Sequence, residues 1–544
     1  TELWYFDEAP DGSRPNQWAQ YGTGTVSTDG SQIVPDIDPA TGKPYGQPRF
    51  CCGINMAAIL ETARQFYFGG GAPSAGGDTA GDPVDLATGL LMVTKTDLVL
   101  PGRLPIALTR TYQTNGTATG PFGRGTTHAA QMAVLIQGNQ RIVRVGDGRR
   151  FAFTQQPGGT FRNTTDGLMQ GAVLTEPGGI PTLRWKDGTR WVFGTSVNQV
   201  TKGLTQQIDR NQNTITNTWN GQRITAITGP DGRQLTFAYD ALDRITRVTD
   251  PLGRAAVYAY DAAGNLATVT DPEGGTTRYT YDSTNRLTTI SDPTGLVFLQ
   301  NFYGPSGRVL RQLQADGSEY RFRYRLSGAG SSGGGCTNLT GNVVSVTLPF
   351  VPCPTVDSWE NFQAGYTVTG GTITETTVVD PRGHVTTTRF NGRGYRTSVT
   401  DALGQTSTVQ RNATNQVVSA TDPLGRTTTF DYDAAGNVTK MLDPALHETR
   451  FTYDSQWNRV TTITDALNQV TEFTYDPANG NLLTVKDPLN QVTTIGYNNV
   501  GQPTSVQGPV ATEPPTTFAY DVHGNLLTTT DPLGNETQRT YDVV

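Results

Sequence analysis

Apolar and polar residues alternate in short stretches along most of the chain, and each stretch ends in a turn sequence. In the segment 276–295 (TTRYTYDSTNRLTTISDPTG), Tyr279 and Tyr281 fall on one face and Arg278 on the other. This alternation predicts a half-buried β-strand at 276–281. A second strand is predicted at 287–291, between two turn sequences rich in Asp, Asn, Pro and Gly. Gly and Asn accept positive φ and Pro pre-sets the second turn position, so the unit is predicted to be a β-hairpin.

The same unit recurs at a regular interval along the chain. Tyr-Asp pairs recur about every 21 residues, and Asp-Pro pairs stand between them. The Tyr-Asp pairs are Tyr239-Asp240, Tyr260-Asp261, Tyr281-Asp282, Tyr432-Asp433, Tyr453-Asp454, Tyr475-Asp476, Tyr520-Asp521 and Tyr541-Asp542. A period of this length indicates an array of one supersecondary unit. The predicted fold is all-β, a continuous antiparallel ribbon of hairpins.

One detail departs from simple alternation. In the second strand of each unit the apolar residues stand three apart, as in Leu266 and Val269, or Leu287 and Ile290. A period of two would place such residues on opposite faces of the sheet. A β-bulge, or a strand buried on both faces, explains the spacing.

The repeated Tyr and Asp have a structural and a functional interpretation. As a lattice, each Tyr packs against its equivalents in neighbouring units and each Asp caps its turn. As a site, the pairs suggest glycan binding or acid catalysis. A residue used in every unit favours the lattice. In addition, Tyr303-Gly304 and Tyr497-Asn498 keep the aromatic residue where the Asp is lost, which points to packing as the main constraint.

The chain divides by composition into seven segments. They are predicted as an extended N-terminal segment (1–50), a short helix (51–68), a Gly-rich linker (69–81), an N-terminal β domain or cap (82–200), hairpin repeats (201–325), an insertion loop with a degenerate repeat (326–375) and further repeats (376–544). A long loop on a rigid scaffold is a favoured place for binding, and a tolerated insertion without a role is the alternative.

Charge and cysteine content narrow the classes of function. The net charge is −7, from 41 basic and 48 acidic residues that are mixed along the chain, which argues against nucleic acid as a partner. No apolar run is long enough for a membrane span. Cys336 and Cys353 flank the Gly-rich insertion and are a candidate disulfide, with free thiols as the alternative. Cys51 and Cys52 are adjacent and are candidate vicinal or intersubunit thiols.

Motifs of catalysis are missing from the sequence. The four histidines are His128, His384, His447 and His523, and none stands in a metal-binding or triad pattern. There is no phosphate loop or nucleophile elbow. We therefore expect no enzyme activity, no cofactor and no metal.

The repeat Y-D-x-x-G-N/R-L-x-x-x-x-D-P-x-G resembles the YD repeat of bacterial Rhs proteins, and the segment from Gly81 to Tyr112 resembles the domain that opens Rhs repeats. The resemblance implies a β-sheet that spirals into a hollow shell or tube. In this family such shells enclose a C-terminal toxin or other cargo, or serve as large extracellular proteins. The C-terminal core motif and the toxin domain of that family are absent from this sequence.

The ribbon length sets an expectation for the shell. Some 15 units of two strands, spaced ~4.8 Å, give roughly 145 Å of ribbon, about one turn of a cylinder ~45 Å wide. We expect a ring or open spiral whose exposed edges pair with more of its own chain or with other copies, as a homopolymer. The favoured function is a structural shell of a secreted or cell-surface bacterial protein. The alternatives are a capsule fragment of a polymorphic toxin and, less favoured, a glycan-binding or glycan-processing protein.

Overall fold

A computed structural model describes residues 79–326 and 372–541, apart from 115, 117, 118 and 305, together with five N-terminal strands. These strands are β1 (Glu2–Asp7), β2 (Gln17–Val26), β3 (Ile33–Pro35), β4 (Ile37–Asp38) and β5 (Lys43–Pro44). The helix expected at 51–68, the four cysteines, Asp542 and nearly all of the expected insertion lie outside the described residues.

One antiparallel sheet of 37 strands, β13 to β49, makes up most of the structure. Its strands follow one another in sequence order, and the pairs β13–β21 and β19–β22 add further contacts. The bounds of the first half are β13 (Ala133–Gln137), β14 (Gln140–Arg144), β15 (Arg150–Gln155), β16 (Phe161–Arg162), β17 (Val173–Thr175), β18 (Thr182–Arg184), β19 (Arg190–Val192), β20 (Thr195–Asn198), β21 (Thr201–Gly203), β22 (Gln206–Ile208), β23 (Thr214–Asn220), β24 (Arg223–Thr228), β25 (Gln234–Tyr239), β26 (Ile245–Thr249), β27 (Ala255–Tyr260), β28 (Leu266–Thr270), β29 (Thr276–Tyr281), β30 (Leu287–Ser291), β31 (Val297–Tyr303), β32 (Val309–Gln314) and β33 (Glu319–Leu326).

The second half begins directly beside β33, since β34 pairs with β33 although residues 327–372 separate them in sequence. Its strands are β34 (Ile373–Val379), β35 (Val385–Phe390), β36 (Arg396–Thr400), β37 (Thr406–Arg411), β38 (Val417–Thr421), β39 (Thr427–Tyr432), β40 (Val438–Leu442), β41 (Glu448–Tyr453), β42 (Val460–Thr464), β43 (Val470–Tyr475), β44 (Leu482–Lys486), β45 (Val492–Tyr497), β46 (Pro503–Gln507), β47 (Thr516–Tyr520), β48 (Leu526–Thr530) and β49 (Glu536–Gln538). The predicted all-β ribbon of antiparallel hairpins is confirmed, and the strands predicted at 276–281 and 287–291 are β29 and β30.

Residues 79–128, called here the opening domain, form small sheets of their own. The strands are β6 (Thr79–Ala80), β7 (Val84–Asp85), β8 (Met92–Leu100), β9 (Ile106–Gln113), β10 (Thr119–Gly120), β11 (Gly123–Arg124) and β12 (Thr126–His128). Residues 79–81, assigned from sequence to the linker, belong to the β6–β7 hairpin, in which Gly81 takes a φ of 63°. The described residues also include three short 3-10 helices, η1 (Ala129–Gln131), η2 (Gly167–Met169) and η3 (Pro177–Gly179).

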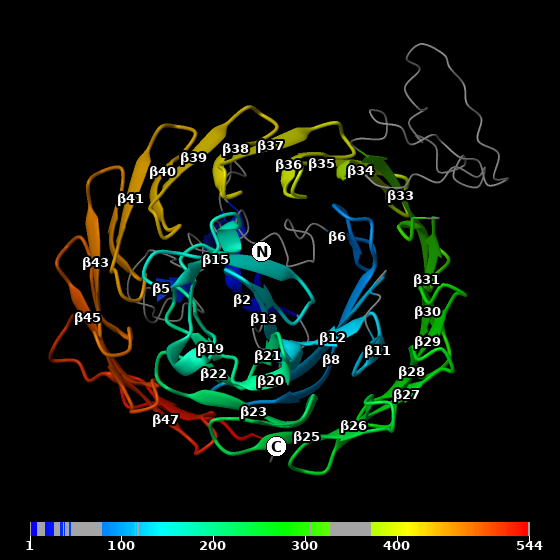
Figure 1. Cartoon of the computed structure of the whole chain (residues 1–544). Helices are drawn as coiled ribbons and strands as arrows, with labels where there is room; N and C mark the ends of the chain where they lie inside the picture. Colours follow the sequence, from blue (N-terminus) through cyan, green and yellow to red (C-terminus); the bar gives the residue numbers. More distant parts are fainter. Residues whose placement is uncertain are drawn as a thin grey trace.

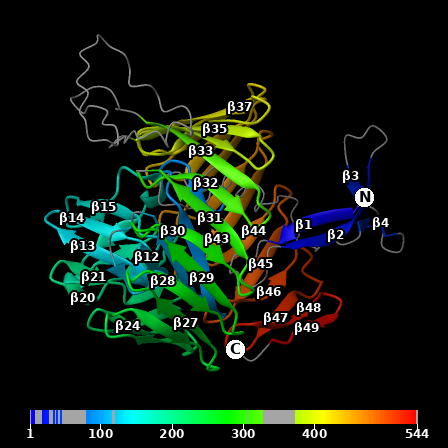
Figure 2. The same ribbon diagram turned by 90° about the vertical axis from the view of Figure 1, so that its right-hand side faces the viewer.

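From β23 onward the long sheet curves into a ring around the opening domain, and in this view β13–β22 lie within the circle of that ring (Figure 1). In the view turned by 90°, β47–β49 lie beyond β20–β24 along the axis of the ring, so the ring is an open spiral (Figure 2). Side chains near the end of the ribbon contact side chains that precede them by 251 to 292 residues. The ribbon thus makes about one turn before it meets itself, in agreement with the length expected from the repeat count.

A β-bulge in each Tyr-Asp hairpin that the structure describes explains the three-residue spacing of the apolar positions. Tyr260 pairs with Leu266 and Ala259 pairs with Thr268, so Ala267 is the extra residue. The same shift occurs beside Tyr239, Tyr281 and Tyr432. One extra residue moves Val269 back to the face of Leu266, and both side chains are buried. The bulge, rather than burial on both faces, therefore explains the three-residue spacing.

The main core lies between the inner face of the ring and the opening domain. Buried residues of β24 to β35, such as Leu235 and Ile245, pack in one cluster with Leu91, Leu108 and Phe122 of the opening domain. A second cluster lies among β13 to β19 and a third around Val417 and Phe430. The opening domain consequently fills the centre of the ring along its first repeats.

Candidate functional site at the turns and seam of the ribbon

Most of the described Tyr-Asp turns are five-residue loops organised by their aspartate, and the turns that begin at Asp454 and Asp476 are one residue longer. In the turn from Asp433 to Asn437, the N–H of Ala435 and of Asn437 donate to Oδ1 of Asp433 at 2.9 and 2.8 Å. The side-chain amide of Asn437 donates to Oδ2 at 2.9 Å. Gly436 takes a φ of 79°, which glycine adopts at low cost. The carboxylate thus satisfies the N–H groups that a hairpin turn leaves without a ladder partner.

The Asp-Pro turns have the same geometry. Arg254 N–H and Leu252 N–H both donate to Oδ1 of Asp250 at 2.9 Å. Where proline is replaced, as after Asp401, the N–H groups of Leu403 and Gln405 still donate to the aspartate, at 2.9 and 2.8 Å. The aspartate rather than the proline therefore defines the turn.

Replacing Asp433 with alanine is expected to lower the free energy of unfolding by about 1–2 kcal/mol, because two backbone N–H groups lose their acceptor. Asp433→Asn should cost less than half as much. Asn412 already accepts from the N–H of Gln416 at 2.9 Å in the equivalent turn, so an amide oxygen suffices. Urea denaturation of the two variants measures the difference. Equal losses for both would mean that the negative charge, rather than the acceptor, stabilises the turn.

The repeated tyrosines link neighbouring hairpins through their hydroxyl groups. Tyr260 Oη donates to the carbonyl of Ile245 at 2.6 Å, and Tyr281 Oη donates to that of Leu266 at 2.9 Å. The acceptor lies 15 residues earlier in each case, and the same bond forms at later repeats. These later donors are Tyr324, Tyr432, Tyr453, Tyr475 and Tyr541.

The tyrosine contacts differ from the ring-against-ring ladder expected from the sequence. In the described part of the chain, the repeat tyrosines of two successive hairpins do not form a ring pair. Instead, the guanidinium of Arg244 lies 4.4 Å from the ring centre of Tyr260, and that of Arg286 lies 5.0 Å from Tyr303. Burial raises the pKa of Tyr239 and of Tyr475 to about 12, so these hydroxyl groups stay protonated donors at neutral pH.

A buried polar cluster fixes the opening domain to the ring. Arg110 and Asp97 form an ion pair (Nε to Oδ2, 2.6 Å) with side chains only 4% and 6% exposed. Tyr258 Oη donates to Oδ2 of Asp97 at 2.9 Å, and Nη2 of Arg110 donates to Tyr279 Oη at 3.0 Å. Burial alone would lower the pKa of Arg110, but the charge of Asp97 raises it above its usual value. Sequence reasoning missed this cluster, although Asp97 and Arg110 lie within the segment that resembles an Rhs opening domain.

His128 is a neutral histidine buried at the same interface. The residue is 1% exposed, and its ring makes an edge contact with Phe122, with centroids 5.5 Å apart. Burial, with a smaller contribution from the charge of Arg144, lowers the pKa of His128 to about 3. Two other histidines lie in Asp-containing turns. Nδ1 of His384 lies 3.0 Å from Oδ2 of Asp380, and Nδ1 of His447 lies 3.0 Å from Oδ2 of Asp443.

We expect the stability of the chain to fall as the pH drops below about 6.5, because unfolded His128 then binds a proton that the folded protein excludes. The unfolded state binds more protons between the folded pKa of about 3 and the ordinary value near 6.5, so stability rises with pH across this window. The slope is about 1.4 kcal/mol per pH unit, or roughly 2 kcal/mol lost at pH 5. Urea denaturation at pH 7 and pH 5 measures it. His128→Phe should remove most of this slope, and a variant that keeps it would refute the assignment.

The turns place two distinct rims on the ribbon. Because the strands alternate in direction, Tyr-Asp turns lie along one rim and Asp-Pro turns along the other. Early turns near Lys186, Asn211 and Asp231 belong to the Asp-Pro rim, since Gly229-Pro230-Asp231-Gly232 joins β24 to β25 as Asp250-Pro251 joins β26 to β27.

The seam is the line along which the late Tyr-Asp rim meets this early rim. Lys186 Nζ donates to Asn437 Oδ1 at 3.3 Å and Asn213 Nδ2 to the Val500 carbonyl at 2.9 Å. His523 Nδ1 lies 3.2 Å from Asp231 Oδ2. Asn458 Nδ2 also donates to the carbonyl of Lys186 at 2.9 Å, and Asn481 Nδ2 donates to Oδ1 of Asn211 at 3.0 Å. The turns of one pass of the ribbon therefore hold the next pass by hydrogen bonds.

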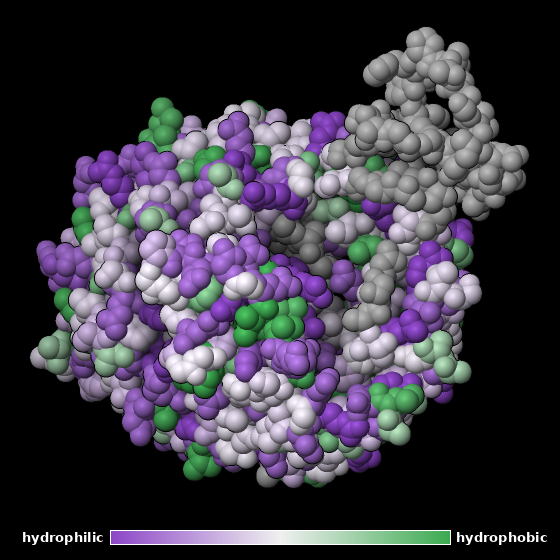
Figure 3. Space-filling view, in the orientation of Figure 1, coloured by the Kyte–Doolittle hydropathy of each residue, from purple (hydrophilic) through white to green (hydrophobic). Residues whose placement is uncertain are grey.

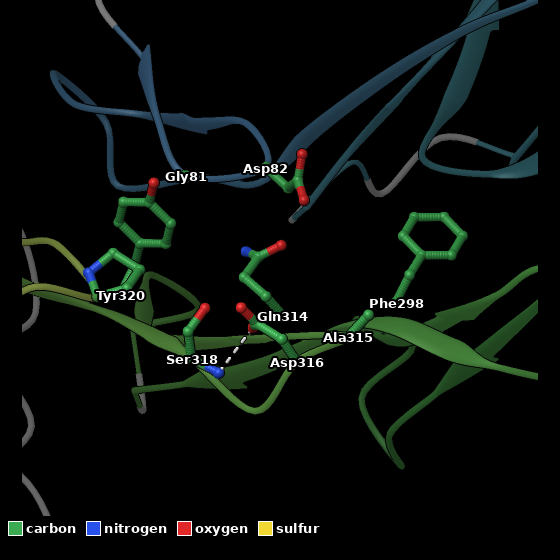
Figure 4. A pocket seen from close by; sticks show the side chains of 9 residues that line it. Gly81, Asp82, Phe298, Gln314, Ala315, Asp316, Ser318 and Tyr320 are labelled. Atoms are coloured by element: carbon green, nitrogen blue, oxygen red, sulfur yellow. Dashed lines mark hydrogen bonds between the residues drawn. The ribbon is translucent and has the colours of Figure 1, made fainter.

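A cleft of about 450 Å³ opens between the opening domain and β31–β33 (Figure 4). Phe298 and Tyr320 stand at its sides and Asp82 faces it from above. Asp316 accepts from the N–H of Ser318 at 2.9 Å, so its carboxylate serves its own turn. The lining contains no histidine or cysteine.

Metal-ligating side chains do not gather elsewhere: the described residues hold no group of three or more His, Cys, Asp or Glu placed to bind a metal ion. Across that same part of the chain, no helix is both long and apolar enough to span a bilayer.

Comparison with known proteins places the repeats in a family. A family model described as RHS Repeat matches residues 220–255, 260–297 and 411–445, and a domain of unknown function (DUF6531) matches residues 81–153. No curated protein matches the chain.

Several solved toxin structures are similar at low identity. The complex of TcdB2, TccC3 and Cdc42 is 14% identical, with 82% of this chain and 26% of that chain covered and a TM-score of 0.39. The Tc holotoxin pore of Photorhabdus luminescens is 13% identical, with the same coverage and a TM-score of 0.40. A TcdB2–TccC3 structure is 13% identical, with 99% and 31% covered and a TM-score of 0.39. The chain spans about a quarter to a third of the length of these structures.

Proposed function

Because the chain is an Rhs-type YD-repeat protein, we propose that it serves as a structural β-shell of a secreted or cell-surface bacterial protein. The observation that carries this proposal is the seam, where a ribbon of hairpins returns on itself after 251 to 292 residues and binds its own earlier turns. A scaffold needs such closure, because a single layer of hairpins without it would stay open and flexible. We further propose that this part of the protein has no enzyme activity.

The Asp-Pro rim of the late repeats supports assembly with further ribbon. Six leucines at the tips of these turns are 75–82% exposed, which is unusual for leucine. They are Leu403, Leu424, Leu446, Leu467, Leu489 and Leu533. The surface view shows hydrophobic residues at separate points around the outer margin of the ring (Figure 3). By analogy with the seam, the partner of this rim is the Tyr-Asp rim of more of the same chain or of another copy. The N-terminal segment is a second proposed route to a homopolymer, together with Cys51 or Cys52, which lie outside the described residues.

A second candidate function, enclosure of cargo, is favoured by the inner face of the late repeats. Leu482 and Val485 occupy the positions that Ile245 and Val248 occupy in an early repeat. Ile245 and Val248 are 0% exposed beneath the opening domain, whereas Leu482 and Val485 are only half-buried. An apolar inner face that is only partly covered suits a further protein segment held inside the shell.

Electron microscopy of the purified natural particle, together with its mass from light scattering, tests both candidates. A structural shell predicts ring-like particles about the width of one ribbon turn. Stacked rings or filaments that separate when Leu424, Leu467 and Leu489 are changed to lysine would support assembly through the Asp-Pro rim. A closed particle with internal density would support cargo. Extended particles without a closed turn would refute the shell.

A further inference from the structure

A second cleft, of about 520 Å³, lies on the seam and is lined by three arginines. Arg184, Arg190 and Arg210 come from the early pass of the ribbon, at the end of β18, the start of β19 and the turn after β22. The opposite wall is the turn between β41 and β42, from Ser455 to Trp457. We propose that this cleft binds a small oxyanion ligand, one that carries carboxylate or phosphate groups.

The arginines of this cleft lack the acidic partners that turn arginines have elsewhere. Arg149, Arg233, Arg244, Arg254, Arg286 and Arg426 each form an ion pair with the aspartate of their own turn, at 2.6 to 2.8 Å. In the described part of the chain, Arg184, Arg190 and Arg210 form no ion pair with a carboxylate. In a chain of net charge −7, three such guanidinium groups around one cleft are a local excess of positive charge.

The bonds that these arginines do form hold them in place without neutralising them. Arg190 Nη2 donates to Oε1 of Gln212 at 2.6 Å. Arg184 Nη2 donates to the carbonyl of Gln456 across the seam, and its guanidinium lies 5.7 Å from the ring centre of Trp457. Nε of Arg210 is buried and has no hydrogen-bond partner. A buried donor without an acceptor is costly, so an oxyanion that reaches it gains a charge-assisted bond.

The nearest acidic residues in sequence are committed to their own turns. Asp187 accepts from the N–H and the hydroxyl of Thr189 at 2.9 and 3.1 Å. Asp209 accepts from the backbone and side chain of Asn213, both at 2.8 Å. Asp454 accepts from the N–H groups of Trp457 and Arg459 at 2.6 and 2.7 Å. None of the three lines the cleft, so its lining carries three positive and no negative side chains.

Trp457 is a wall of the cleft rather than a stacking platform. A Cβ on Gly188 would lie 2.5 Å from its ring, and one on Gly480 would lie 2.8 Å from it. The indole is thus packed between two glycines, one on each pass of the ribbon. The planar guanidinium groups of the arginines therefore recognise the ligand, since their paired N–H donors suit the paired oxygens of a carboxylate or a phosphate. The volume accommodates a molecule with two or three such groups.

Isothermal titration of the full chain with citrate, pyrophosphate and inorganic phosphate at low salt tests the proposal. We expect saturable binding of citrate or pyrophosphate that Arg190→Gln or Arg210→Gln weakens about tenfold each and that the double variant abolishes. A preference for citrate or for pyrophosphate separates a carboxylate from a phosphate ligand. The matched control is Arg278→Gln, which removes an exposed arginine of β29 and should leave binding unchanged.

The ligand should also tie the two passes of the ribbon together, because it lies between walls about 270 residues apart in sequence. Bound citrate or pyrophosphate is therefore expected to raise the midpoint of thermal unfolding of the unmodified chain but not of the double variant. The variants should fold, since the altered side chains have no acidic partner. Absence of binding to all three anions, or equal binding by the unmodified chain and the double variant, would overturn the proposal.

Discussion

Asp97→Ala is expected to lower the free energy of unfolding by about 3–5 kcal/mol, among the largest single effects in this chain. The change leaves the guanidinium of Arg110, which is 4% exposed, without its carboxylate. It also removes the acceptor of Tyr258 Oη. An uncompensated buried charge is far more costly than the loss of a surface ion pair. Because the cluster joins the opening domain to β27 and β29, we also expect faster proteolysis between residues 79 and 128. Urea denaturation and limited proteolysis measure the two effects.

Two further variants separate the buried charge from other causes. Asp97→Ala combined with Arg110→Met should recover much of the lost stability, since an apolar pair of similar size leaves no charge unpaired. Asp431→Ala breaks an ion pair with Lys440 whose side chains are 59% and 39% exposed, and its unfolding midpoint should stay near that of the unmodified chain. If Asp97→Ala behaved like Asp431→Ala, the cluster would not be what holds the opening domain in the ring.

The repeat itself could be predicted from sequence because its signals are local. The alternation at Thr276 to Tyr281 and the turn residues after Asp282 act over a few positions, and β29, β30 and the turn between them follow. The bulge at Ala267 could be predicted only in part from the sequence. The spacing of Leu266 and Val269 required an irregularity, but the register that identifies the extra residue belongs to the paired strand.

The contacts between distant segments were beyond sequence reasoning. Asp97 meets Tyr258, 161 residues later, because the curved ring surrounds the opening domain. Asn437 meets Lys186 across 251 residues, because one turn of the spiral has that length. Neither partner carries a local signal, since each stands in an ordinary turn or strand. The arginine cleft on the seam escapes prediction for the same reason: its lining comes together only when the ribbon closes.

Tyr281→Ala is expected to cost about 3–5 kcal/mol, whereas Tyr281→Phe should cost only about 1 kcal/mol. The phenylalanine loses one hydrogen bond to the carbonyl of Leu266 but keeps the ring packed on the core and against Tyr112, whose centroid lies 6.1 Å away. Alanine loses both and leaves a cavity. Urea denaturation of the two variants separates the hydroxyl from the ring.

Tyr541 provides the matched control for burial. Its hydroxyl donates to the carbonyl of Leu526 at 2.9 Å, as Tyr281 does to Leu266, but the residue is 46% exposed. Tyr541→Ala should therefore cost little more than the hydrogen bond, about 1 kcal/mol. If it cost as much as Tyr281→Ala, the repeated tyrosines would stabilise the ribbon through their hydroxyl hydrogen bonds alone. The expected difference instead makes each tyrosine a packing residue whose value depends on what covers the inner face of the ribbon. A bound segment inside the late repeats should then raise the cost of losing Tyr475 or Tyr520 toward that of Tyr281.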